Sequence, residues 1–226
     1  MKPADFLKKV PLFQSLRAED LEHLAASIRV QSLRKGEVLF RKGSEGTALF
    51  IIKKGNIKIS LPSSIGEEVI LAIFSNGDFL GEMAILDGMP RSTDAVAIEP
   101  SELFVLSRSD FLSFLKNDED TIKSILSVLS MRLRKTDDFL VDTCFRNISA
   151  RLAKTLVELG KKYGHQKGNS TEIYLRLTQK DLASMVGSTR ESVNKELRIL
   201  REKGLISISG KTIRISNLER LKRRFR

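Results

Sequence analysis

The first half of the chain alternates short apolar stretches with glycine turns. Between Leu33 and Leu106 the stretches are EVLF, ALFIIKKG, NIKISL, EEVILAIF and ELFVLS, with glycines at 36, 43, 46, 55, 66, 77 and 81. Several stretches alternate apolar with polar residues, which predicts an antiparallel sandwich or barrel of about eight strands. The segment 17–28 before them has apolar residues at helical spacing and predicts a helix.

Between residues 118 and 145 the apolar spacing changes to alternate steps of four and three. The series comprises Ile122, Leu126, Leu129, Leu133, Thr136, Leu140 and Thr143. Such a heptad seam is typical of a long helix that packs against a second copy of itself. A helix packed only on its own domain needs a wider apolar stripe, and Ile125 and Phe139 widen this one only in places. We therefore predict a homodimer formed through residues 118–145.

The last third predicts a winged helix-turn-helix. Thr178 with Asp181, and Ser188 with Glu191, fit the capping box that begins a helix. Gly187 between them supplies a tight turn, and the strands LISIS and TIRIS that follow predict a two-stranded wing. The predicted fold class is α+β: an N-terminal antiparallel β jelly-roll at 1–117, a dimerisation helix at 118–145 and a winged helix-turn-helix at 146–226.

Charge divides the 226 residues unevenly. Residues 1–145 hold 19 Lys and Arg against 21 Asp and Glu, whereas residues 146–226 hold 20 against 7. This local surplus indicates a polyanionic partner, although a solvated basic terminus has the same composition. No apolar run is long enough for a membrane span and no export signal is visible, so we expect a cytoplasmic protein. One cysteine, Cys144, is too few for a disulfide or a four-cysteine iron–sulfur site.

The second helix of the predicted pair is the candidate reader of double-stranded DNA. In the major groove Arg190 and Lys195 would donate to guanine, and Glu191 would accept from cytosine. Capping of its own helix is the alternative role of Glu191. Asn194 lies on the same helix surface. Phosphate contacts are predicted for Thr178, Gln179, Thr189 and Lys211.

The segment GEMAILDGMPRST, residues 81–93, holds an acid and an arginine nine positions apart. Gly81 allows close backbone approach, and the residues after it open a helical turn. Arg91 supplies a charge-assisted contact to a phosphate, Ser92 adds a hydroxyl, and Glu82 accepts a ribose hydroxyl. A buried Glu82–Arg91 ion pair is the alternative. No catalytic constellation is present, so we do not expect an enzyme.

With these motifs in this order, the chain resembles the cyclic-AMP receptor protein (Crp/Fnr) family of bacterial regulators over nearly its whole length. GDFLGEMAILDGMPRST resembles the family's phosphate-binding cassette, and GSTRESVNKELRILREKGLI its recognition helix. The resemblance implies a dimer controlled by cyclic AMP that binds a two-fold symmetric operator with half-sites similar to TGTGA. RNA polymerase is a further candidate partner. The implied effector contacts are Gly81, Glu82, Met83, Ala84, Arg91, Ser92, Thr136 and Asp137.

Two positions depart from the family pattern. In its cyclic-AMP-binding members the threonine matched by Thr136 contacts adenine, and the next residue reaches the nucleotide of the other subunit. That residue is usually small and neutral but here is Asp137, which either accepts from the adenine amino group or alters effector choice. Cyclic GMP and cyclic di-GMP are therefore alternative effectors. Lys195 replaces the arginine of the best-known member, which loosens guanine preference there.

Three further alternatives differ in the residues that they require. Haem sensing requires an iron ligand, but His23 lies in the leading helix and His165 in the polar loop KKYGHQKGNS, so no metal is predicted. A regulatory module of an enzyme such as a kinase would explain the cassette but not the winged helix. A regulator of the same family that binds DNA without any effector is the third.

Overall fold

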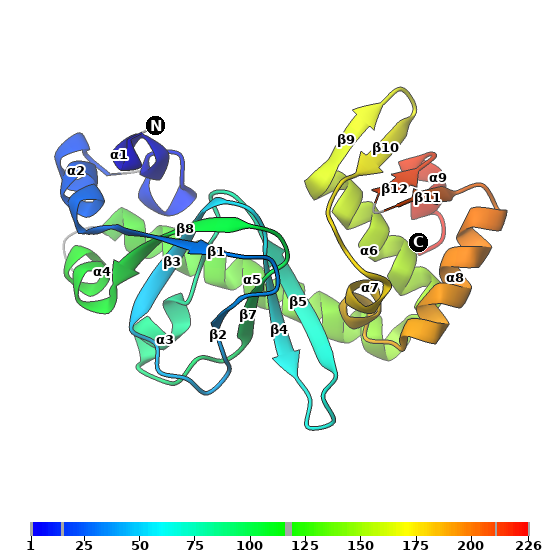
Figure 1. Cartoon of the computed structure of the whole chain (residues 1–226), viewed down its shortest axis with the longest axis horizontal. Coiled ribbons are helices and arrows are strands. Elements are labelled where there is room, and N and C mark those ends of the chain that lie inside the picture. The colour runs from blue at the N-terminus through cyan, green and yellow to red at the C-terminus, as the bar shows by residue number, and fades with distance from the viewer. Residues whose placement is uncertain (1, 15, 116–118, 211, 226) are drawn as a thin grey trace. The chain divides into compact units, whose positions relative to one another are not determined.

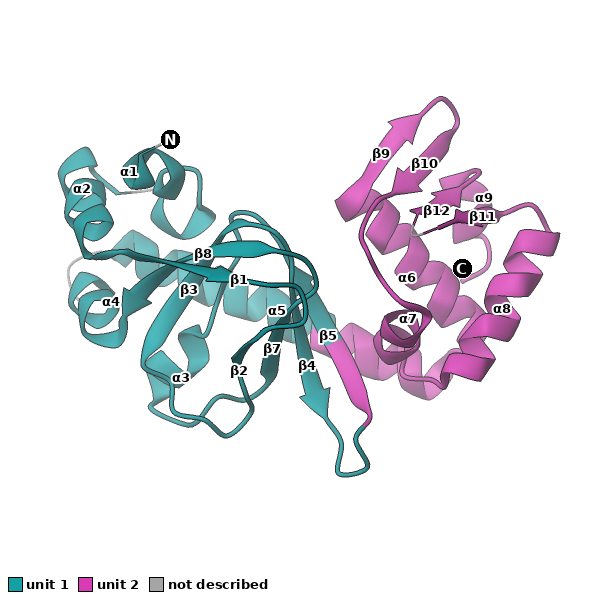
Figure 2. Cartoon of the chain, in the orientation of Figure 1, with its two compact units in different colours: residues 1–66, 71–135 teal, residues 67–70, 136–226 magenta. Residues whose placement is uncertain are grey.

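The computed structural model describes residues 2–14, 16–115, 119–210 and 212–225, and it divides the chain into two units. Unit 1 comprises residues 1–66 and 71–135, and unit 2 comprises residues 67–70 and 136–226 (Figure 2). The predicted boundaries at residues 117 and 145 follow sequence motifs and stay predictions.

Two four-stranded sheets form the body of unit 1 (Figure 1). Their strand orders are β1-β8-β3-β6 and β2-β7-β4-β5, with antiparallel pairing as between β3 and β8. The strands are β1 (Arg29–Leu33), β2 (Val38–Phe40), β3 (Ala48–Lys54), β4 (Ile57–Pro62), β5 (Glu68–Phe74), β6 (Phe79–Leu80), β7 (Asp94–Ala97) and β8 (Ser101–Ser107). These eight strands within the described residues confirm the predicted sandwich.

Strand β3 is buried on both faces, which explains its continuous apolar run. Leu49 and Ile51 pack into a core beneath the helices, whereas Phe50 and Ile52 pack between the two sheets. Because side chains alternate along a strand, a strand covered on both sides needs apolar residues at every position.

Helices cover the outer face of the first sheet. They are α1 (Pro3–Leu7), the 3-10 turn η1 (Pro11–Phe13), α2 (Ala18–Ser27), α4 (Arg108–Leu115) and the long α5 (Glu119–Phe145), while the short α3 (Glu82–Asp87) follows β6. Helix α2 confirms the predicted leading helix. Helix α5 buries Thr121 and Ile125 on this side, so its first turns are anchored in unit 1.

Unit 2 combines helices with a third four-stranded sheet. Its elements are α6 (Ile148–Tyr163), β9 (Gly164–Lys167), β10 (Ser170–Ile173), α7 (Gln179–Val186), α8 (Arg190–Glu202), β11 (Ile206–Ser209), β12 (Thr212–Ile215) and α9 (Leu218–Lys222). Helices α7 and α8 form the predicted helix-turn-helix, and Gly187 between them has a left-handed φ of 59°. The wing strands β11 and β12 are confirmed, with their turn at Gly210.

One of the two predicted helix starts lies a residue later than expected. Thr178 and Asp181 make both hydrogen bonds of the capping box, as predicted. The second helix is capped by Thr189, whose Oγ1 accepts from the backbone N–H of Ser192 at 3.2 Å, so the prediction of Ser188 as the cap is wrong. Glu191 consequently occupies the second helical position and does not cap the helix.

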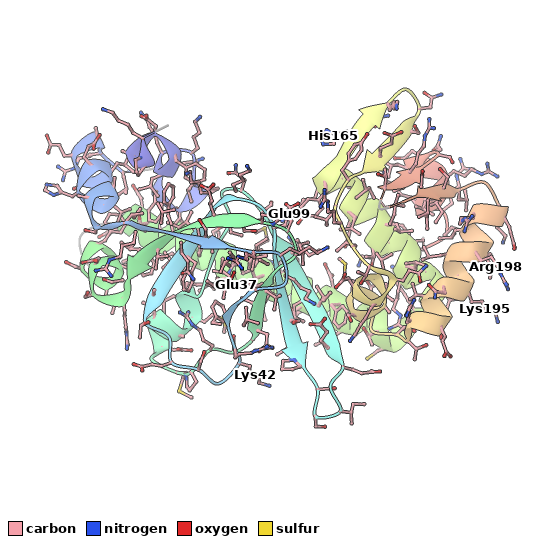
Figure 3. All side chains as sticks on the ribbon, viewed as in Figure 1. Glu37, Lys42, Glu99, His165, Lys195 and Arg198 are labelled. Carbon is pink, nitrogen blue, oxygen red and sulfur yellow. The ribbon has the colours of Figure 1, made fainter. Side chains whose placement is uncertain are left out.

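The segment KKYGHQKGNS is also structured differently from the prediction. His165 lies in strand β9, which pairs with β10 and extends the wing into a sheet of order β11-β12-β10-β9 (Figure 3). The segment is polar because β9 is an edge strand with exposed residues, and such strands lack the apolar alternation that reveals buried ones. The prediction of a polar loop is therefore wrong.

Candidate functional sites

Arg91 is a buried cation that forms no ion pair with a carboxylate in the described part of the chain. It is only 4% exposed, and its guanidinium donates to the carbonyl oxygens of Gly81 at 2.6 Å and Ala48 at 2.7 Å. The rings of Phe40 and Phe50 lie 4.5 and 5.5 Å from the guanidinium carbon. Burial lowers the pKa of Arg91, and the charge of Glu82 acts in the opposite direction. Among the described residues no carboxylate oxygen lies within ion-pair distance of Arg91.

Glu82 is neutralised by a different arginine. It is 2% exposed, and its Oε1 accepts from Arg132 of α5 at 2.6 Å, while Arg132 also donates to the carbonyl of Phe79 at 2.5 Å. The Arg132 guanidinium lies 4.4 Å from the ring centroid of Phe74. The alternative of a buried Glu82–Arg91 pair is therefore wrong: the structure pairs Glu82 with Arg132.

Two buried polar atoms of this site have no hydrogen-bond partner in the described part of the chain: Nε of Arg91 and Oε2 of Glu82. Leaving a charged group buried and unsatisfied is costly. An anion at Arg91 and a hydroxyl donor at Glu82 would satisfy both atoms. A cyclic nucleotide carries both groups, a phosphate and a ribose 2′-hydroxyl, so the residues present fit that class of ligand.

Glycine residues let the backbone close around Arg91. Gly81 caps α3 with a φ of 88°, and a Cβ there would lie 2.4 Å from Nη1 of Arg91 and 3.1 Å from the carbonyl oxygen of Ala48. A Cβ at Gly46 would lie 2.3 Å from the Cβ of Ala84. Sequence reasoning treated Gly46 only as a turn residue, whereas the structure requires it for close packing against α3. We call Gly46, Gly81, Glu82, Ala84 and Arg91 the cradle.

The other predicted effector contacts are exposed. Met83 and Ser92 lie beside each other at the cradle surface, with the Ser92 hydroxyl 3.8 Å from the Met83 sulfur. Thr136 and Asp137 are exposed on α5 and belong to unit 2, so their contact with the effector stays a prediction. Sequence reasoning missed Arg132, although its spacing of four residues from Thr136 was an available signal.

Helix α8 buries one face and exposes charge on the other. Val193, Leu197 and Leu200 are buried, which matches the predicted apolar side. Lys195 and Arg198 project from the outer side of the helix (Figure 3). Arg190 and Glu191, the other candidate base contacts, are exposed at the beginning of the helix, where residues of a recognition helix usually reach base edges.

The remaining candidates for DNA contact have different surroundings. Gln179 is exposed, whereas the Thr178 hydroxyl donates to Asp181 at 2.6 Å as part of the cap. Asn194 is half-buried, and its Oδ1 has no hydrogen-bond partner among the described residues. Lys211 lies outside the described residues.

A search of the described ranges finds no group of three or more metal-ligating side chains. Nor do they contain a helix with the length and hydropathy of a membrane span.

Fold and sites together define a class of protein: a β-roll with a charged cradle, joined to a DNA-binding helix-turn-helix. Comparison with known families agrees. Residues 30–118 match the cyclic nucleotide-binding domain, and residues 150–224 match the Crp-like helix-turn-helix domain. Similar relatives include the CRP-like cAMP-activated global transcriptional regulator of Mycobacterium tuberculosis, 32% identical over 222 residues, with 98% of this chain and 99% of the relative aligned.

The cyclic AMP receptor protein of Thermus thermophilus is 27% identical, with 92% and 94% of the two chains aligned. Among solved structures, the c-di-GMP-responsive regulator CLP of Xanthomonas campestris has a TM-score of 0.77 at 24% identity, covering 88% of this chain and 99% of that one. FixK2 of Bradyrhizobium japonicum has a TM-score of 0.78 at 21% identity, with 87% and 96% covered. The chain belongs to the Crp/Fnr family of DNA-binding transcription regulators, which are not enzymes.

Proposed function

We propose that the protein is a dimeric transcription regulator whose sequence-specific DNA binding is controlled by cyclic AMP. One observation carries the effector half of this proposal: Arg91 is buried without a counter-charge among the described residues. Because Arg132 already neutralises Glu82, the cradle holds one uncompensated positive charge. A buried ion in that state destabilises the folded chain until an anion arrives, and the phosphate of a cyclic nucleotide supplies one.

Different predicted contacts would bind different groups of the nucleotide. Arg91 would hold the phosphate with support from the Ser92 hydroxyl, and Oε2 of Glu82 would accept the ribose hydroxyl. Met83 and Ala84 lie in the turn that follows Glu82. The choice of cyclic AMP is supported by the name of the Mycobacterium tuberculosis relative and by Thr136, which matches the adenine-contacting position of the family.

A dimer through α5 is supported by the exposed leucines of the heptad seam. Leu126, Leu133 and Leu140 are 59%, 63% and 56% exposed in a single chain. Exposed leucines at this spacing are covered in a two-stranded coil, where each would insert between residues of the partner helix. We infer a parallel pair, because parallel helices bring both DNA-binding units to the same end. An antiparallel pair would separate them along a rod about 40 Å long.

In the dimer, the two copies of α8 would enter successive major grooves about 34 Å apart on a two-fold symmetric operator. Arg190, Glu191 and Lys195 are the proposed base contacts, and RNA polymerase is a further proposed partner. Since Thr189 rather than Glu191 caps the helix, Glu191 is available to accept from cytosine. Control of DNA binding requires the effector to favour one dimer conformation over another, typically by about 1–3 kcal/mol.

Calorimetry with cyclic AMP, cyclic GMP and cyclic di-GMP tests the effector. The critical variant is Arg91→Gln, and its matched control is Arg41→Gln, because Arg41 already has a carboxylate partner in Asp94 at 3.0 Å. We expect tightest binding of cyclic AMP, lost in Arg91→Gln and retained in Arg41→Gln. Gel-shift titration of a TGTGA-containing palindrome with and without the bound nucleotide then tests control. Equal DNA affinity in both conditions would refute control by that nucleotide.

A further inference from the structure

Exposure along α5 indicates which residues border its dimer seam. The exposed leucines Leu126, Leu133 and Leu140 take the a positions of the heptad, which assigns position d to Thr136. Ile125, one residue before an a position, is 3% exposed and packs into the unit 1 core. The g positions therefore lie between the seam and the body of unit 1.

Arg132 occupies such a g position and is held in place by its own chain. Its side chain is 23% exposed, it donates to Glu82 and to the carbonyl of Phe79, and it packs on the ring of Phe74. A guanidinium fixed in this way presents a defined charge at the border of the seam. It also holds Oε1 of the carboxylate whose Oε2 has no partner among the described residues.

Asp137 occupies the complementary e position. It is exposed, and no ion pair or hydrogen bond to it is found in the described residues. In a parallel two-stranded coil, a g residue of one helix faces the e residue of the following heptad on the other helix, which is five positions further along. From Arg132 that position is Asp137, so the pair has opposite charges.

We propose that the partner subunit's Asp137 pairs with Arg132 and thereby positions Glu82 for the effector. This proposal rests on the parallel dimer of the proposed function and deepens it. Each site would then contain a row of three charges, Glu82, Arg132 and the partner's Asp137, of which Arg132 is the centre. Asp137 is a positioning residue for the neighbouring chain, and it makes no contact with the nucleotide. Dimer assembly and effector binding reinforce each other through this row.

A double-mutant cycle on the ligand-free dimer tests the pair. Sedimentation equilibrium would measure the dimer dissociation constant of Asp137→Asn, Arg132→Gln and the double variant. Because the dimer contains two such pairs, we expect Asp137→Asn to weaken it about two- to thirtyfold at low salt. The substitution should have no further effect in the Arg132→Gln background. Asp138→Asn is the matched control because Asp138 is also exposed but takes position f of the heptad, outside the seam. Additive effects of the two substitutions would overturn the proposal.

Mixed dimers test whether Asp137 acts on the other chain. One chain carries Arg91→Gln, so that only the second chain binds nucleotide, and Asp137→Asn is placed in either chain. Calorimetry with cyclic AMP should show nucleotide affinity about two- to fivefold weaker when Asp137→Asn lies in the chain that carries Arg91→Gln. When Asp137→Asn lies in the chain that binds the nucleotide, the nucleotide affinity should be unchanged. Loss in the binding chain alone, or equal loss in both arrangements, would overturn the proposal.

Cyclic inosine monophosphate separates this role from direct base contact. It lacks the amino group of adenine but keeps the ribose and phosphate. If Asp137→Asn weakens the binding of both nucleotides equally, Asp137 acts through Arg132, which supports the proposal. If it weakens the binding of cyclic AMP alone, Asp137 contacts adenine, which overturns the proposal. If the wild-type dimer binds no cyclic nucleotide, the effector half of the proposed function fails. The double-mutant cycle on the ligand-free dimer still shows whether Arg132 and the partner's Asp137 form an ion pair. If the wild-type chain is a monomer, the dimer and this proposal fail together.

Discussion

Gly81→Ala compared with Gly77→Ala tests whether the cradle depends on close packing around Arg91. Both glycines have a left-handed φ, 88° at Gly81 and 83° at Gly77. Alanine in this left-handed region costs about 1–2 kcal/mol at either position. A Cβ at Gly77 meets no atom within 4 Å, whereas at Gly81 it lies 2.4 Å from Nη1 of Arg91. The guanidinium must therefore move by about 1 Å to reach van der Waals distance.

The two variants should consequently differ in ligand binding far more than in backbone strain. Each should lower the melting temperature by about 2–8 °C through its φ value, and Gly81→Ala somewhat more. A hydrogen bond to a charged group contributes about 1.5–3 kcal/mol, so displacing Arg91 should weaken cyclic-nucleotide binding about 10- to 150-fold.

Differential scanning fluorimetry and calorimetry at one temperature measure both quantities. Gly77→Ala should bind the nucleotide as the wild type does, because the Arg91 guanidinium is undisturbed. An equal loss of affinity in both variants would show that general destabilisation, rather than the position of Arg91, controls binding. Close packing around Arg91 would then not be what sets the affinity of the cradle for its ligand.

Three other predictions concern the remaining elements. Thr189→Ala should destabilise unit 2 by about 1 kcal/mol in chemical denaturation, and Ser188→Ala by less than about 0.5 kcal/mol, since Thr189 is the cap; the reverse order would contradict the assignment. Arg190→Ala and Lys195→Ala should each lose about 1–3 kcal/mol of discrimination at one base pair, measured by competition with mutated operators; uniform loss on all sequences would assign them to phosphates instead. Leu133→Asp should sediment as a folded monomer, and an unchanged dimer would place the interface elsewhere.

Hydrophobic periodicity predicted most of the fold because burial imposes it directly. The two-residue alternation of the first domain and the heptad spacing of α5 are consequences of which side chains are covered. Ile125 illustrates the limit of that information. Its apolar character is visible in the sequence, but only the structure shows that it packs into unit 1 while Leu126 beside it stays exposed.

Local motifs predict helix starts less reliably where two adjacent residues carry the same hydroxyl group. Ser188 and Thr189 both precede α8, and either hydroxyl can cap a helix, so the motif with glutamate three residues later favoured the wrong one. The backbone after Gly187 decides the matter, because its left-handed turn places the helix start one residue further on. The sequence does not reveal strand β9, because this strand has no apolar pattern of its own and forms through hydrogen bonds with β10.

The charge arrangement of the cradle depends on a contact that no sequence pattern contains. Fifty positions separate Glu82 from Arg132, and the acid lies much closer in sequence to Arg91. The sequence therefore leaves open, as the alternative to a ligand clamp, a Glu82–Arg91 ion pair that would make the site neutral. The structure assigns the neutralising role to Arg132, because α5 passes where Glu82 is buried, and it leaves Arg91 with backbone carbonyls and aromatic rings as neighbours. A buried arginine in such surroundings is stabilised by an anion, so the pairing of Glu82 with Arg132 supports the proposal that Arg91 binds the phosphate of the effector.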